Sequence, residues 1–279
     1  MIYIGLTGWG DHDSLYEGIP LSQKLITYAG HFPIVELDSS FYAVQPEKTM
    51  AKWAAETPDS FSFIVKAYQC MTGHQNGFGP FEDKEAMFTA FIDSLQPLGS
   101  KLAMVLCQFP PWFDCRKENV QWVRYVKEKL SGFPVALEFR NQSWFSESMR
   151  ERTLAFMEEE GWIHSICDEP QAGNGSIPTV LHPTHSTKTL VRLHGRNVYG
   201  WNDTKDGKWR EVRYLYRYNE TELEEWRHNV LELEKKCKNI YVIFNNNSGG
   251  DAADNAKQLI EALGIKYEGL APRQLDLFE

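Results

Sequence analysis

The chain has 279 residues, of which 42% are apolar and 13% aromatic, and its formal net charge is −9. This length and composition allow a sizeable core and suit either one α/β barrel or two small domains. The acidic balance argues against strong direct binding of nucleic acid or of an anionic membrane, because both partners usually need a basic surface.

The first residues, MIYIGLTGW, lead directly into strand-like sequence without the charged region and cleavage site of a signal peptide. No apolar run is long enough to span a membrane. The five cysteines are odd in number and lack the spacing of metal ligands, which favours free thiols in a reducing compartment. We therefore expect a soluble, cytoplasmic protein.

Short apolar runs alternate with longer amphipathic ones along the chain, a pattern typical of repeated βα units. Eight runs are predicted to be strands: 3–8, 34–41, 62–68, 102–109, 134–140, 163–168, 190–194 and 240–245. Helical patterns lie at 21–32, 46–56, 84–98, 117–130, 147–160, 220–236 and 253–263. Eight strands with seven helical crossovers favour a TIM-type (β/α)8 barrel over a doubly wound sheet, and no Gly-rich nucleotide-binding turn supports the latter.

The sixth βα unit is the exception to this regularity. The stretch between Asp168 and Leu190 contains too much Pro, Gly and Thr for a regular helix, so we expect an irregular connection there. No stretch reads as a linker between domains. The sequence therefore predicts a single barrel domain over residues 1–271, followed by a C-terminal tail over 272–279.

The predicted strand at 134–140 carries two charges on one face. Glu138 and Arg140 share parity, although a strand covered on both faces is normally apolar throughout. In a barrel, functional residues gather at the carboxyl ends of the strands. Polar residues do lie at these ends: Thr7, Glu36, Asp38, Lys66, Tyr68, Gln108, Glu138, Arg140, Asp168, Arg192, His194, Asn245 and Asn247. We expect Glu138 to point into the barrel mouth beside Lys66 and Arg192, with Arg140 one layer higher.

Several stretches resemble the YecE-like family, catalogued as domain of unknown function 72. They are ELDSSFYAV (36–44), FSFIVKAYQCMTGH (61–74), LCQFPPWF (106–113), ALEFRNQSW (136–144), VRLHGR (191–196) and IFNNNSGGDAADNA (243–256). The resemblance covers essentially the whole chain and implies a TIM-type barrel, but no established activity. It departs at Asp38 and Ser40, where the family commonly has Asn and Thr.

The residues at the predicted strand ends suggest carboxylate chemistry on an anionic substrate. The predicted catalytic residues are Glu36, Glu138, Asp168 and His194. Substrate binding is predicted for Lys66, Tyr68, Gln108, Arg140, Trp144, Arg192 and Asn245, with the cationic groups holding an anion such as phosphate. Two alternatives remain. The oxygen and imidazole groups of Glu36, Asp38, Glu138, Asp168 and His194 could hold one or two divalent metal ions, or the charges could simply neutralise one another as a structural plug.

Aromatic residues also gather near the predicted strand ends. A stacking surface for a sugar, a base or another flat ligand is one interpretation, and ordinary packing is the other. The residues are Trp9, Tyr42, Phe109, Trp112, Trp144 and Trp201.

The tail ends in QLDLF (274–278), which resembles the peptide by which bacterial repair and replication proteins dock on the DNA sliding clamp. In that resemblance Gln274 is the polar anchor, Leu275 makes an apolar side contact, and Leu277 and Phe278 fill a hydrophobic pocket. Docking of the tail on its own barrel is the alternative.

Three functions are compatible with these features. The first is a hydrolase-like enzyme acting on a phosphorylated or nucleic-acid-derived substrate and brought to DNA by its tail. The second is a clamp-associated binding or scaffold module without catalysis. The third is a carbohydrate or small-metabolite enzyme unrelated to DNA.

Overall fold

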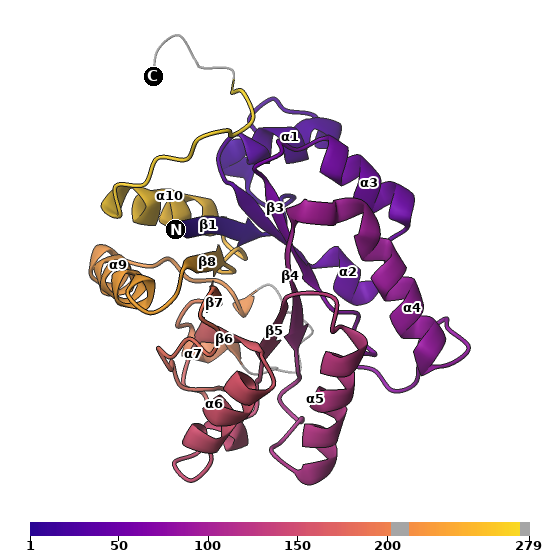
Figure 1. The fold of residues 1–279 in the computed structure, drawn as a ribbon. Helices are drawn as coiled ribbons and strands as arrows, with labels where there is room; N and C mark the ends of the chain where they lie inside the picture. The colour runs from indigo at the N-terminus through magenta and orange to yellow at the C-terminus, as the bar shows by residue number, and fades with distance from the viewer. Residues whose placement is uncertain (202–211, 274–279) are drawn as a thin grey trace.

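The computed structural model describes residues 1–201 and 212–273. Its eight parallel strands close into a barrel in the order of the chain (Figure 1), which confirms the predicted fold. The strands are β1 (Ile2–Thr7), β2 (Ile34–Leu37), β3 (Ser62–Lys66), β4 (Leu102–Gln108), β5 (Val135–Glu138), β6 (Ile163–Asp168), β7 (Lys188–Leu193) and β8 (Asn239–Phe244).

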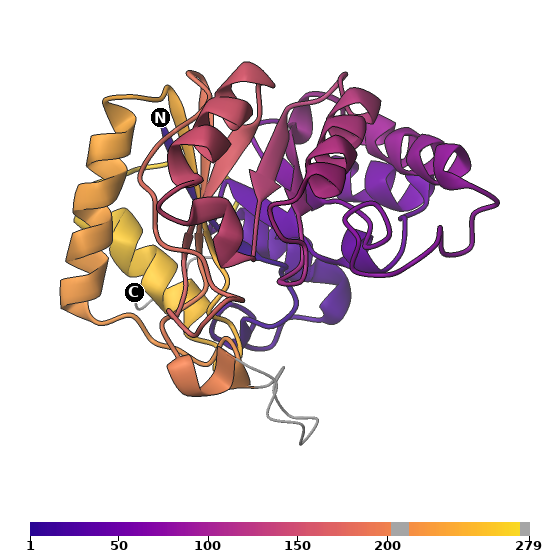
Figure 2. The ribbon, with the colours of Figure 1, turned by 90° about the horizontal axis from the view of Figure 1, so that it is seen from below.

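Helices surround the barrel and cover the outer faces of its strands (Figure 1). The longer ones are α1 (Lys24–Ala29), α3 (Glu47–Ala55), α4 (Lys84–Leu95), α5 (Lys117–Lys129), α6 (Arg150–Glu159), α9 (Glu220–Glu234) and α10 (Ala252–Ala262). Figure 2 shows α9 and α10 packed against one another on the outside. Helix α9 begins at a capping box, in which the Asn219 side chain accepts from the Glu222 amide and the Glu222 side chain accepts from the Asn219 amide. No helix within residues 1–201 and 212–273 is both long and apolar enough to cross a membrane.

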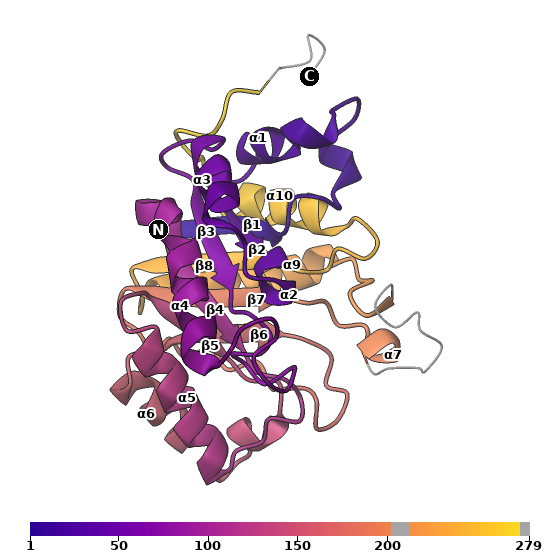
Figure 3. The same cartoon turned by 90° about the vertical axis from the view of Figure 1, so that its right-hand side faces the viewer.

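Short helices occupy several loops. They are α2 (Ser39–Tyr42), α7 (Val198–Trp201), and the 3-10 helices η1 (Asp13–Leu15), η2 (Leu21–Gln23), η3 (Gln96–Lys101) and η4 (Gln142–Phe145). Helices α2 and α7 follow the carboxyl ends of β2 and β7, and in Figure 3 α7 lies on the opposite side of the barrel from the start of β1. The loops that frame a possible site therefore gather at one end of the barrel.

The second strand is shorter than predicted. It ends at Leu37, and α2 begins at Ser39 where the sequence suggested continued strand up to Phe41. The Ser40 hydroxyl lies 2.8 Å from the Leu37 carbonyl and 2.7 Å from the Lys66 carbonyl, so it bonds to the ends of β2 and β3 at once. This turn brings the residues after β2 across the barrel mouth.

The connection between β6 and β7 contains no helix among its residues 169–187, as the sequence predicted. Threonine side chains of this connection bond to the backbone in and next to β6. The Thr184 hydroxyl donates to the Trp162 carbonyl and accepts from the His164 amide, and the Thr179 hydroxyl donates to the Cys167 carbonyl. These bonds hold the connection against β6 in the absence of a helix among residues 169–187.

The barrel interior is apolar toward the amino ends of the strands. A cluster formed only by strand residues fills it, including Ile34, Ile64, Met104, Leu106, Ala136, Ile163, Leu190 and Ile243. Gly5 of β1 leaves room for the neighbouring strand, because a Cβ at this position would lie 2.0 Å from the Ile34 carbonyl oxygen. Toward the carboxyl ends the inward residues become charged, and these residues form the candidate site.

Candidate functional site

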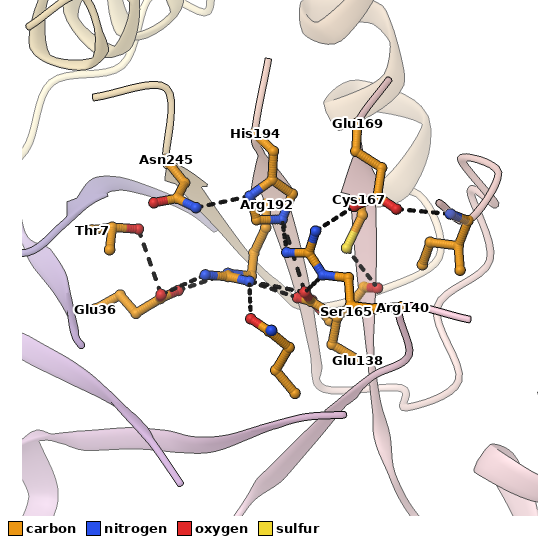
Figure 4. A network of polar contacts seen from close by, with 12 residues as sticks. Thr7, Glu36, Glu138, Arg140, Ser165, Cys167, Glu169, Arg192, His194 and Asn245 are labelled. Carbon is orange, nitrogen blue, oxygen red and sulfur yellow. Dashed lines mark hydrogen bonds and ion pairs between the residues drawn. The ribbon is translucent and has the colours of Figure 1, made fainter. Parts of the chain in front are cut away.

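Arg192 of β7 lies at the centre of a buried ionic network (Figure 4). Its Nε and Nη2 donate to the two carboxylate oxygens of Glu36 on β2, at 2.8 and 2.6 Å. Its Nη1 lies 3.0 and 2.9 Å from the two oxygens of Glu138 on β5. Burial raises the pKa of Glu36, while the attraction of Arg192 opposes that rise. One guanidinium therefore joins strands from opposite parts of the sheet.

Arg140, just beyond β5, extends this network. Its Nε donates to Glu138 at 2.6 Å and its Nη1 to Glu169 at 2.5 Å. Glu138 also accepts a hydrogen bond of 2.9 Å from the Ser165 hydroxyl. Burial by itself would raise the pKa of Glu138. The positive charges of Arg140 and Arg192 together outweigh this effect of burial and lower the pKa of Glu138 to about 2. With both oxygens engaged by two cations, Glu138 is a fixed anion and a poor proton acceptor.

His194 takes a neutral, oriented form in this network. Arg140 Nη2 lies 2.8 Å from His194 Nε2, and because a guanidinium only donates, this ring nitrogen must accept. Burial lowers the pKa of the imidazole well below its usual value, and the nearby positive charges of Arg140 and Arg192 lower it further. The proton of the neutral ring then resides on Nδ1, which lies 2.9 Å from the side-chain amide of Asn245. His194 is thus positioned to hold Arg140 as a neutral ring, and it is not the imidazolium that a general acid needs.

A cavity of about 510 Å³ opens above this network at the barrel mouth. Its lining residues come from loops after six different strands: Asp38, Phe41, Tyr42, Lys66, Gln69, His74, Gln108, Pro111, Trp112, Arg140, Arg213, Tyr214, Asn245 and Asn247. Lys66 Nζ lies 3.1 Å from Asp38 Oδ1 and 4.6 Å from the centre of the Phe41 ring. The cavity is therefore lined by cationic and aromatic side chains that adjoin one another.

Most of the predicted site residues come together here. Glu36, Glu138, Arg140, Arg192 and His194 form the network, and the Gln108 side-chain oxygen lies 3.4 Å from Arg192 Nη1. Lys66, Gln108, Arg140 and Asn245 line the cavity itself. Of the carboxylates predicted as catalytic, Glu36 and Glu138 lie beneath the cavity, where they are paired with arginines.

Asp168 lies elsewhere, so its predicted role in the pocket needs correction. Its carboxylate accepts from Arg196 Nε at 3.0 Å and from the indole of Trp226 on α9 at 2.8 Å. On β6 the odd-numbered residues Ile163 and Ser165 point into the barrel. Because alternate residues of a strand point to opposite faces, the even-numbered Asp168 points outward, toward the surrounding helices. The inward carboxylate is the next residue, Glu169.

Tyr68 and Trp144 are also outside the cavity lining. Tyr68 packs edge-to-face on Phe81, at 5.9 Å between ring centres. Trp144 stacks on Phe139 at 3.7 Å and donates through its indole to the Phe113 carbonyl at 2.8 Å. Both side chains are buried in the packing around the barrel, which agrees with the ordinary-packing interpretation of these aromatics.

The residues at the site that were missed from the sequence include His74, Glu169, Arg213 and Tyr214. Glu169 had a usable signal, because it shares parity with Ser165 and Cys167. Burial raises its pKa to about 7, opposed by Arg140. The other three lie in loops after β3 and β7, where no periodicity indicates which way a side chain points.

The described residues do not suit a divalent cation. Glu138, Cys167 and His194 offer three ligand atoms within 4.8 Å of one another. However, Glu138 is bonded to both arginines and His194 Nε2 accepts from Arg140, so a cation there would face two guanidinium groups. Of the other predicted ligands, Glu36 is paired with Arg192, Asp38 with Lys66 and Asp168 with Arg196. We therefore assign no step to a metal.

The predicted clamp-binding residues Gln274, Leu275, Leu277 and Phe278 lie outside the described residues. The described chain reaches Arg273, and the Ala271 amide donates to the Ala29 carbonyl at the end of α1.

Comparison with known proteins places this architecture in a family. The UPF0759 protein YunF of Bacillus subtilis (strain 168) is 64% identical over 282 residues, covering 100% of both chains. The UPF0759 protein YecE of Escherichia coli (strain K12) is 29% identical over 155 residues, or 55% of this chain and 54% of that protein.

Solved structures agree with these relatives. A DUF72 family protein (EF0366) from Enterococcus faecalis V583 has a TM-score of 0.93 at 37% identity, covering 99% of this chain and 100% of that one. A DUF72 family protein (TM1631) from Thermotoga maritima MSB8 has a TM-score of 0.80 at 30% identity, covering 95% and 100%. The family model described as "Protein of unknown function DUF72" matches residues 3–276. This chain therefore belongs to the DUF72 family.

Proposed function

We propose that this protein is a hydrolase-like enzyme that binds a small phosphorylated substrate at the barrel mouth. The observation that carries the proposal is the charge distribution of the cavity. Lys66, Arg140 and Arg213 line it, whereas Asp38 is the one carboxylate among its described lining residues. A phosphate group would find several cationic hydrogen-bond donors on this lining.

Arg140 is suited to bind such a group because the network holds it in place. Among the described residues it donates from Nε to Glu138, from Nη1 to Glu169 and from Nη2 to His194. A guanidinium has five N–H groups, so one remains on each terminal nitrogen. These two donors form the planar fork that matches a phosphate. The buried carboxylates therefore act as positioning residues for Arg140.

Lys66 supplies the second cationic contact. Its ammonium group has three N–H donors, and its ion pair with Asp38 needs one of them. The side-chain amides of Gln108 and Asn245 line the same cavity and offer neutral donors. Together these groups could hold a phosphate ester while charge develops on its oxygens.

Asp38 is the proposed general base. It lines the cavity, in contrast to Glu36 and Glu138, whose oxygens are occupied by Arg192 and Arg140. In the proposed reaction Asp38 accepts a proton from water, the water oxygen bonds to phosphorus, and the ester P–O bond breaks. The electron pair of that bond passes to the leaving oxygen, which takes a proton from solvent and departs as the alcohol. Lys66 keeps the carboxylate beside the bound anion.

A calorimetric titration with inorganic phosphate and ribose 5-phosphate tests this proposal. We expect Lys66→Met to weaken both ligands by at least about tenfold, because a phosphate loses a charged partner. Lys52→Met is the matched control, since Lys52 is an exposed lysine of α3 paired with Glu56. Absence of binding by the wild-type protein would overturn the proposed site.

The catalytic part needs a separate measurement. Asp38→Asn should abolish phosphate release from ribose 5-phosphate and other phosphate monoesters while retaining their binding, because the amide removes the base and a negative charge. If the wild-type protein binds these esters but releases no phosphate, the enzyme proposal fails, and a binding module without catalysis becomes the better description.

We also propose that residues 274–278 recruit the protein to a DNA sliding clamp. Support comes from the sequence QLDLF, in which a polar anchor precedes apolar side chains. Tethering would concentrate an acidic protein near DNA without a basic surface. The full chain should bind purified clamp in a surface-plasmon measurement, and Leu277→Ala together with Phe278→Ala should abolish the signal. Equal binding by the double variant would exclude the motif as the contact.

A further inference from the structure

A continuous row of aromatic rings forms one side of the cavity. Tyr42 contacts Phe41 at 5.2 Å between ring centres, Phe41 contacts His74 at 4.8 Å, and His74 contacts Trp112 at 6.0 Å. All three pairs are edge-to-face, with interplanar angles of 88°, 88° and 75°. All four residues line the cavity, and we call them the aromatic wall. They come from the loops after β2, β3 and β4.

Hydrogen bonds hold the aromatic wall in place. The Trp112 indole donates to the Gly73 carbonyl at 3.2 Å, and His74 Nδ1 lies 2.9 Å from the Thr72 hydroxyl. The Phe41 carbonyl accepts from the Gln69 amide at 3.0 Å, which ties the loop after β2 to the loop after β3. The rings are therefore arranged before any ligand arrives, which lowers the entropic cost of binding.

Both ends of the wall are solvent-exposed. The exposed fraction is 58% for Tyr42 and 65% for Trp112, so neither ring is needed to complete the core. Large exposed aromatic surface beside a cavity is typical of a ligand-binding site. Burial lowers the pKa of His74, and the positive charges of Lys66 and Arg140 lower it further, to about 3. The ring is therefore neutral and packs edge-to-face against its aromatic neighbours.

The wall adjoins the cationic part of the cavity. Lys66 Nζ lies 4.6 Å from the centre of the Phe41 ring, so an anion at Lys66 and a ring on the wall would be neighbours. The volume of about 510 Å³ is within the range of small-ligand pockets. A purely anionic ligand would leave the wall unused, and a purely apolar one would make no use of the cationic side chains.

From this arrangement we propose that the substrate is a planar ring joined to a phosphate group, with the ring stacked on the aromatic wall and the phosphate at Lys66 and Arg140. This inference rests on the proposed phosphate site and adds the chemical class of the remaining part of the substrate. Nucleotides and aryl phosphates share this chemistry. A nucleoside monophosphate fits the wall because every base presents a flat π face.

The test compares four ligands in the same calorimetric assay: inorganic phosphate, ribose 5-phosphate, adenosine 5′-monophosphate, and 4-nitrophenyl phosphate as the aryl alternative. We expect the two ring-bearing ligands to bind at least about tenfold more tightly than ribose 5-phosphate, which is the gain typical of base stacking on an aromatic side chain. The tighter of the two identifies the source of the ring.

Substitution of Trp112 locates the ring. Trp112→Ala should weaken the preferred ring-bearing ligand by about tenfold and leave ribose 5-phosphate unchanged, whereas Trp112→Phe should retain most of the affinity because it keeps a flat face. Phe78→Ala is the control, as Phe78 is an exposed aromatic residue of the β3–α4 loop that does not line the cavity. A thermal melt of each variant verifies folding.

The outcomes separate this inference from the proposed function. If ribose 5-phosphate binds and the ring-bearing ligands bind no better, the aromatic wall is not a subsite and only this inference fails. If Trp112→Ala weakens all phosphates equally, the inference fails as well. If none of the phosphates binds, the proposed function fails with it.

Discussion

Replacing Glu138 by Gln gives the sharpest test of the buried network. Glu138 is fully buried and accepts hydrogen bonds from Arg140, Arg192 and Ser165. The substitution keeps the shape of the side chain but removes its charge. Arg192 would then be paired only with Glu36, and Arg140 only with Glu169, while the new amide N–H groups would face other donors.

The expected loss follows from the pKa of Glu138. The network lowers it from the usual 4.5 to about 2, which corresponds to about 3 kcal/mol of stability at neutral pH. Removal of one partner from a buried ion pair gives a similar figure, about 3–5 kcal/mol. Because the folded-state pKa is depressed, this stabilisation is fully present above about pH 4.5 and is lost as the pH falls toward 2.

Urea unfolding followed by circular dichroism measures this effect. We expect Glu138→Gln to lower the free energy of unfolding by at least about 3 kcal/mol at pH 7, and by about 1 kcal/mol less near pH 3.5. Glu224→Gln is the control, since Glu224 is an exposed carboxylate paired with Arg227, and its loss should change stability little. A loss for Glu138→Gln below about 1 kcal/mol at pH 7, or a loss independent of pH, would refute this account of the network.

Two further predictions concern the barrel and its buried carboxyl groups. Gly5→Ala should lower the free energy of unfolding by more than about 3 kcal/mol in urea, because the added Cβ would lie 2.0 Å from the Ile34 carbonyl oxygen. Gly132→Ala is the control and should have a much smaller effect, since no atom lies within 4 Å of its added Cβ. Equal losses for the two variants would argue against the close approach of β1 and β2. Glu169 has a pKa raised to about 7, so its contribution to stability is present below about pH 4.5 and is lost as the pH rises through 7. The stability of the wild-type protein relative to Glu169→Gln should therefore fall by up to about 3 kcal/mol between pH 4.5 and pH 8 in urea titrations, and a constant difference would contradict the raised pKa.

The ionic network clarifies why charged residues can lie inside this barrel. Three carboxylates and two guanidinium groups satisfy one another across strands β2, β5, β6 and β7. Such a network is a weak source of stability relative to an apolar core. Its value under the proposed function is the orientation of Arg140, which lines the cavity. The plug interpretation and the site interpretation are thus compatible, since the plug forms the floor of the site.

The sequence by itself determined the eight βα units, the barrel and the irregular sixth connection. Each strand or helix was predicted from the periodicity of its own apolar residues, so no information about distant parts of the chain was needed. The spacing of two residues between Glu138 and Arg140, and between Arg192 and His194, is also local information. It predicted that both members of each pair point to the inner face of the barrel. Several polar residues at the mouth were therefore predictable by number.

The tertiary structure decided which of these residues can act and which only support others. A single step in parity turns Asp168 outward and Glu169 inward, because successive side chains of a strand point to opposite faces. The pKa of Glu138 depends on arginines from two strands, and the aromatic wall assembles Tyr42, His74 and Trp112 from three loops. These properties depend on distances between residues remote in the chain, so only the closed barrel could establish them.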